Sequence, residues 1–239
     1  MADNARWTAQ TARAGDVAGI DQGLRTYMLR VYNYMTAGLA ITGLVAWIVS
    51  QSPALLSTIH GTPLKWVVML APIGVVLLFS MRLHKMSAAS AQLVYWGFAG
   101  LMGLSISYIF AAYTDASIAR VFFITAGTFA ATSLYGYTTK RDLSKFGSFL
   151  MMGLIGVILA SVVNIFLGSD MLSFAISIIG VIVFVGLTAY DTQRIKETYD
   201  VVSHDGQMMQ KTAIFGALQL YLSFLNLFML LLNLLGNRE

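Results

Sequence analysis

The charged residues of this chain are gathered into short clusters with long uncharged stretches between them, and this spacing restricts the possible fold more than any other feature. Between Val31 and Leu64, for example, no Asp, Glu, Lys or Arg occurs. Hydrophobic residues make up 57% of the chain and charged residues only 11%, which is far more apolar than a typical soluble domain. A run of about 20 apolar residues crosses a bilayer as a helix, because a helix satisfies its backbone hydrogen bonds internally. The sequence therefore predicts an all-α integral membrane protein.

Seven stretches are long and apolar enough to cross the membrane. We expect transmembrane helices at residues 32–50, 66–81, 88–112, 121–138, 146–167, 171–190 and 213–235. Residues 1–30 are expected to form a polar N-terminal tail, since they contain no apolar core typical of a signal peptide. Residues 31–239 then form one membrane domain, because no repeat or low-complexity tract divides them. The longest internal loop is expected at Asp191–Lys211, whose first part can continue the sixth helix.

The distribution of Lys and Arg among the loops predicts the orientation of the chain. Seven spans place the two termini on opposite sides, and cytoplasmic loops carry an excess of Lys and Arg. If the N-terminus is cytoplasmic, that side receives twelve of the 15 Lys and Arg residues, and the other side receives only Lys65, Arg120 and Arg238. We therefore expect the N-terminus in the cytoplasm and the C-terminus outside.

Composition excludes several classes of function. The chain has no cysteine, and its three histidines, His60, His84 and His204, stand in separate loops. This pattern lacks the spacing of a metal site or of a hydrolase with a histidine base. Gly-rich phosphate-binding motifs are also missing from the sequence. The net charge of +4 comes from loops beside membrane spans, so it does not indicate nucleic-acid binding. We expect no enzyme activity, no cofactor and no bound metal.

Asp191 stands at the end of the sixth apolar run. An acid beside hydrocarbon is protonated, paired or turned toward water, and it is a candidate functional residue. Its position alone favours a simpler interpretation, in which Asp191 marks the point where the sixth helix reaches cytoplasmic water. An intramembrane aspartyl protease is disfavoured, because it needs two carboxylates at one depth. Asp170, at the other end of the same span, lies at the opposite face of the membrane.

Four polar residues form a stripe on the seventh span. They stand at positions i, i+4, i+7 and i+14, which share one face of a helix: Gln219, Ser223, Asn226 and Asn233. Lipid offers such side chains no hydrogen-bond partner, so the stripe must face other helices or water. Hydrogen bonding between helices and lining of a pathway are both open at this point.

Four segments carry a family likeness: Leu134–Ser144, Gly186–Ile195, Gly216–Phe228 and, more loosely, Gly100–Ser107. In this combination and order they resemble the Bax inhibitor family of multipass membrane proteins, also called the transmembrane Bax inhibitor motif group. Within it, they are similar to the bacterial branch that includes the YccA-type proteins. The resemblance extends from the first span to the end of the chain. The C-terminal residues lack the basic extension of eukaryotic members, which favours a bacterial inner membrane.

The resemblance implies a seven-helix fold with the last helix at its centre and, in some members, a pH-sensitive calcium leak. In those members the acid at the position of Asp191 pairs with a second aspartate on the last helix, and two nearby carboxyls share a proton. In this chain the second position is Ser223, within Tyr221-Leu-Ser-Phe224, and serine does not titrate. We therefore expect a weaker pH response than in relatives with both acids.

The resemblance and the polar stripe together predict which residues line an ion pathway and sense pH. These are Asp191, Ser223, Asn226 and Gln219, with Arg194 and Arg82 as candidate counter-charges to Asp191. Depth argues against contact between Asp191 and Ser223. At about 1.5 Å per residue, Ser223 lies about 18 Å from Lys211, whereas Asp191 lies about 7.5 Å from Lys196. Contact therefore requires the sixth helix to extend well beyond Lys196.

Two functions follow as expectations. The first is a cation leak, chiefly for calcium, with Asp191 at the cytoplasmic end of the pathway and with the lipid bilayer and calcium ions as partners. The alternative, which the likeness to YccA-type proteins suggests, is a regulator of membrane-protein quality control that presents residues 1–30 to a membrane-bound protease. A purely structural membrane protein is a third interpretation.

Overall fold

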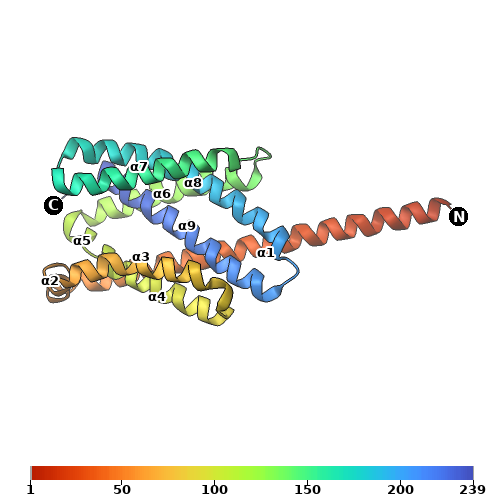
Figure 1. Ribbon diagram of the computed structural model, residues 1–239, viewed down its shortest axis with the longest axis horizontal. Coiled ribbons are helices and arrows are strands. Elements are labelled where there is room, and N and C mark those ends of the chain that lie inside the picture. Colours follow the sequence, from red (N-terminus) through yellow and green to blue (C-terminus); the bar gives the residue numbers. More distant parts are fainter. Residues whose placement is uncertain (1, 239) are drawn as a thin grey trace.

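The structure is a computed structural model that describes residues 2–238, with side chains described from residue 22 onward. The described chain is almost entirely helical (Figure 1). Its elements, in order, are α1 (Ala2–Ser50), α2 (Pro53–His60), α3 (Leu64–Arg82), the single 3-10 turn η1 (Leu83–Lys85), α4 (Ala88–Ile106), α5 (Ile109–Ala112), α6 (Asp115–Thr138), α7 (Ser144–Leu167), α8 (Asp170–Val202) and α9 (Gly206–Leu235).

Seven helical segments in the described part of the chain are long and apolar enough to cross a membrane. They comprise residues 22–50, 64–85, 88–112, 115–138, 144–167, 170–202 and 206–235. The predicted all-helical fold with seven spans is therefore confirmed. Helices α6, α8 and α9 begin before the predicted apolar runs, and a polar residue caps each of them there. The N-cap of α6, for example, is Thr114, whose hydroxyl accepts a hydrogen bond from the Ser117 backbone amide.

The sixth span differs most from its predicted bounds. Helix α8 continues to its end at Val202, so the loop expected at Asp191–Lys211 is reduced to the turn Ser203–Asp205 before α9. The helix persists because apolar residues recur there at helical spacing, and Ile195, Tyr199 and Val202 are buried. The ring of Tyr199 packs 5.5 Å from a tyrosine ring of α1.

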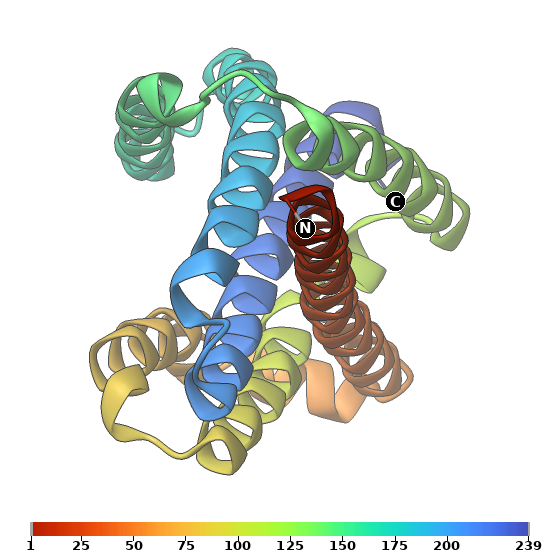
Figure 2. The same ribbon diagram turned by 90° about the vertical axis from the view of Figure 1, so that its right-hand side faces the viewer.

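Helix α9 lies at the centre of the bundle. It contacts α1, α4, α6 and α8, and Figure 2 shows it between the other helices. Leu220, Tyr221, Leu227 and Leu232 are 0% exposed. The Tyr221 hydroxyl lies 2.6 Å from the hydroxyl of Thr42 on α1. The last helix is therefore the central one, as the sequence comparison with the family led us to expect.

The first part of α1 projects beyond the other helices (Figure 1). Residues 1–30 were expected to form a polar tail. The helix runs from Ala2 through this segment, and the first membrane-spanning segment begins at Gln22. Tyr27 and Met28 are already buried against the bundle. The placement of this segment in the cytoplasm stays a prediction.

Two glycines help to place α8 beside its neighbours. At Gly136 of α6, an added Cβ would lie 2.2 Å from the carbonyl oxygen of Ala189 on α8. Only glycine allows this approach, which holds α8 against α6 two residues before Asp191. Gly168 ends α7 with a φ of 59°, a left-handed conformation that glycine adopts readily. The next residue, Ser169, caps α8, so α7 and α8 are joined by a short turn and pack side by side.

Candidate functional site

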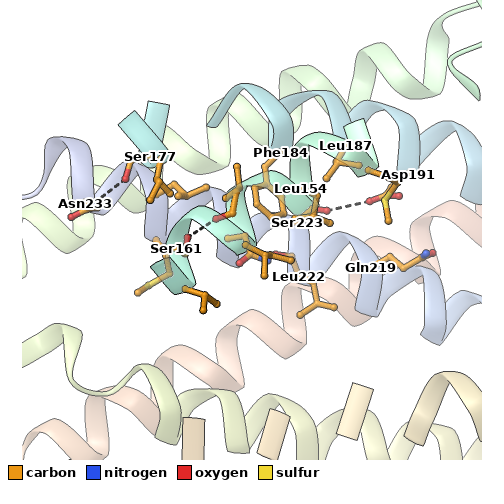
Figure 3. Close-up of a pocket in the computed structure, with 18 of the residues that line it drawn as sticks. Leu154, Ser161, Ser177, Phe184, Leu187, Asp191, Gln219, Leu222, Ser223 and Asn233 are labelled. Carbon is orange, nitrogen blue, oxygen red and sulfur yellow. Dashed lines mark hydrogen bonds between the residues drawn. The ribbon is translucent and has the colours of Figure 1, made fainter. Parts of the chain in front are cut away.

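A cavity of about 910 Å³ lies between α7, α8 and α9 (Figure 3). Apolar side chains make up much of its wall, including Leu154 and Ile158 of α7 and Phe184 and Leu187 of α8. Polar side chains also reach it from all three helices: Ser161, Asn164, Ser173, Ser177, Tyr190, Asp191, Arg194, Gln219, Ser223, Asn226 and Asn233. We call it the Asp191 cavity.

Asp191 and Ser223 are in contact in this cavity (Figure 3). The Ser223 hydroxyl donates a hydrogen bond of 3.2 Å to Oδ2 of Asp191. Ser223 is 4% exposed, whereas Asp191 is half-buried. A contact between Asp191 and Ser223 required the sixth helix to extend well beyond Lys196, and α8 continues to Val202. Asp191 therefore faces a cavity and a neutral hydrogen-bonding partner on the central helix.

The other predicted residues divide into two groups. Gln219, Asn226 and Arg194 line the same cavity as Asp191. The side-chain amide of Asn226 donates to the Leu222 carbonyl of its own helix, at 2.8 Å. Arg82 is exposed at the end of α3 and is not among the residues that line the cavity.

Five other polar residues of the cavity were not predicted from the sequence: Ser161 and Asn164 of α7, and Ser173, Ser177 and Tyr190 of α8. Ser173, Ser177, Phe184, Leu187 and Asp191 all line the cavity and share one face of α8. Their spacing of three, four or seven residues is the signal that could have identified the two serines. The residues from α7, by contrast, lie in an apolar helix whose faces the sequence does not distinguish.

The two residues after Asp191 attach α8 to its surroundings. The Thr192 hydroxyl lies 2.9 Å from that of Ser133 on α6, which in turn lies 2.6 Å from the hydroxyl of Tyr32 on α1. Gln193 accepts a hydrogen bond from the Leu143 amide and donates one to the Arg141 carbonyl, both at 2.8 Å. These bonds hold the helix rotation that turns Asp191 toward the cavity.

The cavity has few oxygen donors for a tightly bound metal ion, and Arg194 also lines it. Within the described chain, no group of three or more His, Cys, Asp or Glu side chains is placed to hold a metal ion. The cavity offers one carboxylate among hydroxyl and amide oxygens. These are the oxygen ligands that calcium prefers, but a calcium site usually has six to eight of them.

Along nearly its whole length, the chain is similar to known membrane proteins. Residues 24–239 match the family model described as inhibitor of apoptosis-promoting Bax1. The inner membrane protein YbhL of Escherichia coli K12 is 47% identical over 219 residues, which cover 91% of this chain and 94% of YbhL. A protein of Rickettsia prowazekii is 49% identical over 92% of both chains. A membrane protein of Streptococcus pyogenes is 32% identical over 92% of this chain and 96% of its own.

Proposed function

The chain belongs to the Bax inhibitor family of membrane proteins, and on that premise we propose that it is a cation leak, chiefly for calcium. It is a multipass integral membrane protein. Its relative YbhL is named as an inner membrane protein, and we place this chain in the same membrane. Its N-terminus lies in the cytoplasm in this proposal, as the distribution of Lys and Arg predicts.

The observation that carries the proposal is the contact between Asp191 and Ser223 in a cavity lined partly by polar residues. An ionisable residue inside a membrane protein, turned toward a cavity, is typical of an ion pathway. A carboxylate there attracts cations, and hydroxyl and amide oxygens replace part of their hydration shell. Ser223 cannot share a proton with Asp191, so the flux should respond to pH more gradually than with two carboxyls.

Calcium flux into proteoliposomes tests this proposal. We expect native protein to exceed empty liposomes, and Asp191→Asn to lower the flux by about tenfold or more. At an effective dielectric constant of about 20, one charge about 4 Å from an ion contributes about 4 kcal/mol. Asp200→Asn is the matched control, because Asp200 is exposed on the same helix and does not line the cavity. Ser223→Asp should sharpen the pH response by restoring a coupled pair.

Two results would overturn the proposal. One is native flux equal to that of empty liposomes at every pH tested. The other is an equal effect of Asp191→Asn and Asp200→Asn, because the Asp191 cavity would then have no special part in the flux.

A second candidate function is regulation of membrane-protein quality control, as in the YccA-type interpretation of the sequence. The observation in its favour is the helical segment of α1 that projects beyond the bundle, where a membrane-bound protease could reach it (Figure 1). Deleting residues 2–21 should abolish regulation of the protease and leave calcium flux unchanged. Asp191→Asn should have the opposite effects.

A further inference from the structure

The Asp191 cavity has a second group of polar residues, far from Asp191. Asn233, near the C-terminal end of α9, lies about 21 Å along the helix from Gln219 at about 1.5 Å per residue. Its side-chain amide donates hydrogen bonds to the hydroxyls of Ser173 and Ser177 on α8, at 3.0 and 2.8 Å. Figure 3 shows the bond to Ser177 at the opposite end of the cavity from Asp191. We call Ser173, Ser177 and Asn233 the Asn233 cluster.

A positive charge is bonded to this cluster. The guanidinium of Arg238 donates a 2.7 Å hydrogen bond to Oδ1 of Asn233. The amide of Asn233 is thereby engaged on both sides, by serine hydroxyls and by the guanidinium. Arg238 itself does not line the cavity, so it meets the cluster from the C-terminal side.

The chain after α9 is held in a position that keeps Arg238 there. The Asn237 amide donates to the Ser117 hydroxyl at 2.9 Å, and the Thr114 amide donates to the Asn237 carbonyl at 3.1 Å. The Arg238 guanidinium lies 5.8 Å from the centre of the Tyr113 ring, within the range of a cation–π contact. Several bonds to the start of α6 therefore fix this short segment.

The charge of Arg238 is permanent. Contact with the Tyr113 side chain and, more weakly, attraction by Asp170 at the start of α8 raise the pKa of Arg238 above its usual value. A guanidinium stays protonated in proteins in any case. The titratable groups around the cluster thus leave one fixed cation beside Asn233.

We propose that Arg238 is a tethered cation that limits entry of other cations to the Asp191 cavity through the Asn233 cluster. This inference deepens the proposed function and rests on it for its physiological meaning. The guanidinium occupies an oxygen, Oδ1 of Asn233, that an entering cation would use, and its charge lowers the local concentration of cations. Arginine side chains act as electrostatic barriers of this kind in other membrane pathways.

A purely structural role for the cluster makes a different prediction. Hydrogen bonds of Asn233 to Ser173 and Ser177 would join α8 to α9 whether or not Arg238 carried a charge. Loss of that charge would then leave access to the cavity unchanged. The two roles are therefore separated by measuring access rather than stability.

The natural sequence contains no cysteine, so a single introduced thiol can report access. Ser173→Cys places the thiol in the Asn233 cluster and keeps the bond between Asn233 and Ser177. The rate at which small cationic and anionic methanethiosulfonates modify this thiol is measured in nanodiscs. The protein with Arg238 is compared with the protein that also carries Arg238→Gln. Gln219→Cys, at the Asp191 end of the same cavity, is the matched control.

We expect Arg238→Gln to raise the rate of the cationic reagent at Ser173→Cys by about fivefold, the factor that one unit charge about 4 Å away produces in water. The rate of the anionic reagent should rise less. The cationic rate at Gln219→Cys, at the far end of the cavity, should also rise less than at Ser173→Cys. Arg238→Lys should keep the cationic rate low, because it keeps the charge. Equal rates with Arg238 and with Arg238→Gln overturn the inference, and so does an equal rise at both thiols, which would indicate general loosening.

Calcium flux through the same Arg238→Gln protein separates this inference from the proposed function. A rise in both thiol access and flux supports both. Changed thiol rates without flux in any protein mean that Arg238 controls access to a cavity that is not a calcium leak. Calcium flux with unchanged thiol rates supports the leak and contradicts a role of Arg238 in it.

Discussion

Three consecutive residues of α8 have three different environments. Asp191 faces the cavity and Ser223, Thr192 contacts Ser133 on α6, and Gln193 bonds to the loop between α6 and α7. Successive side chains of a helix point about 100° apart, so three consecutive residues can contact three different neighbours. Only Asp191 is a candidate to meet an ion. Its two neighbours fix the rotation and position of the helix.

Gln193→Ala should therefore lower stability without removing the carboxylate from the cavity. The substitution leaves the backbone amide of Leu143 without its partner, and a lost buried hydrogen bond costs about 1–3 kcal/mol. We expect a lower melting temperature by thermal denaturation of the purified protein. Gln207→Ala, on an exposed residue of the first turn of α9, should leave the melting temperature unchanged. Equal melting temperatures for native protein and Gln193→Ala would contradict this account of Gln193.

At the scale of helices, the distance between α6 and α8 depends on the missing side chain of Gly136. A Cβ added at Gly136 would lie only 2.2 Å from the carbonyl oxygen of Ala189. A methyl group cannot be accommodated there by moving a flexible side chain, because the obstacle is backbone. The helices themselves must separate, and Asp191 lies just beyond the contact.

Gly136→Ala should destabilise the protein by about 1–3 kcal/mol, as overpacking of a close interface does, and should also alter calcium flux. Gly127→Ala on the same helix is the control, since nothing lies within 4 Å of its added Cβ. That change should be neutral or slightly stabilising, because alanine favours a helix more than glycine does. Thermal denaturation and flux are measured on both proteins, and a Gly136→Ala protein as stable as Gly127→Ala would refute the close approach.

At the scale of the whole molecule, the distribution of charge predicts the orientation in the membrane, and α9 forms the centre of the packing. The central helix buries most of its leucines and Tyr221, and it contacts four other helices. The connections α3–α4, α6–α7 and α8–α9, near which most of the Lys and Arg residues stand, lie at the end of the bundle where α1 projects (Figure 1). Asp191 and the Asn233 cluster lie at opposite ends of the cavity (Figure 3).

The orientation can be tested with single cysteines in exposed turns, given that the natural chain has none. We expect Gln51→Cys to react with a membrane-impermeant maleimide in intact cells, because its turn lies outside when the N-terminus is cytoplasmic. Lys140→Cys should react only after the membrane is permeabilised. Both residues are exposed in the structure. The reverse pattern would show that the N-terminus lies outside.

Much of this architecture follows from the sequence, because the bilayer core offers no hydrogen-bond partners to the backbone. Apolar runs separated by charged clusters have few alternatives to membrane-spanning helices, so the number of spans and the class of fold were predictable. The acid at Asp191 and the polar stripe of α9 were visible for the same reason, since polar groups stand out among apolar ones. The C-terminal bound of α8 was not predictable, because residues 191–202 include many polar residues although one face of this segment is buried.

Only the tertiary structure decided which polar residues meet. The uniformly apolar spans do not show which of their faces touch, and that depends on helix rotation and on close contacts such as the one at Gly136. The contact of Asp191 with Ser223 required the extended α8, and the bond of Arg238 to Asn233 required a chain segment folded back onto α6. By itself the sequence determined how many helices cross the membrane, because hydrophobic length is a local property. Packing determined the cavity, because its walls come from residues far apart in the chain.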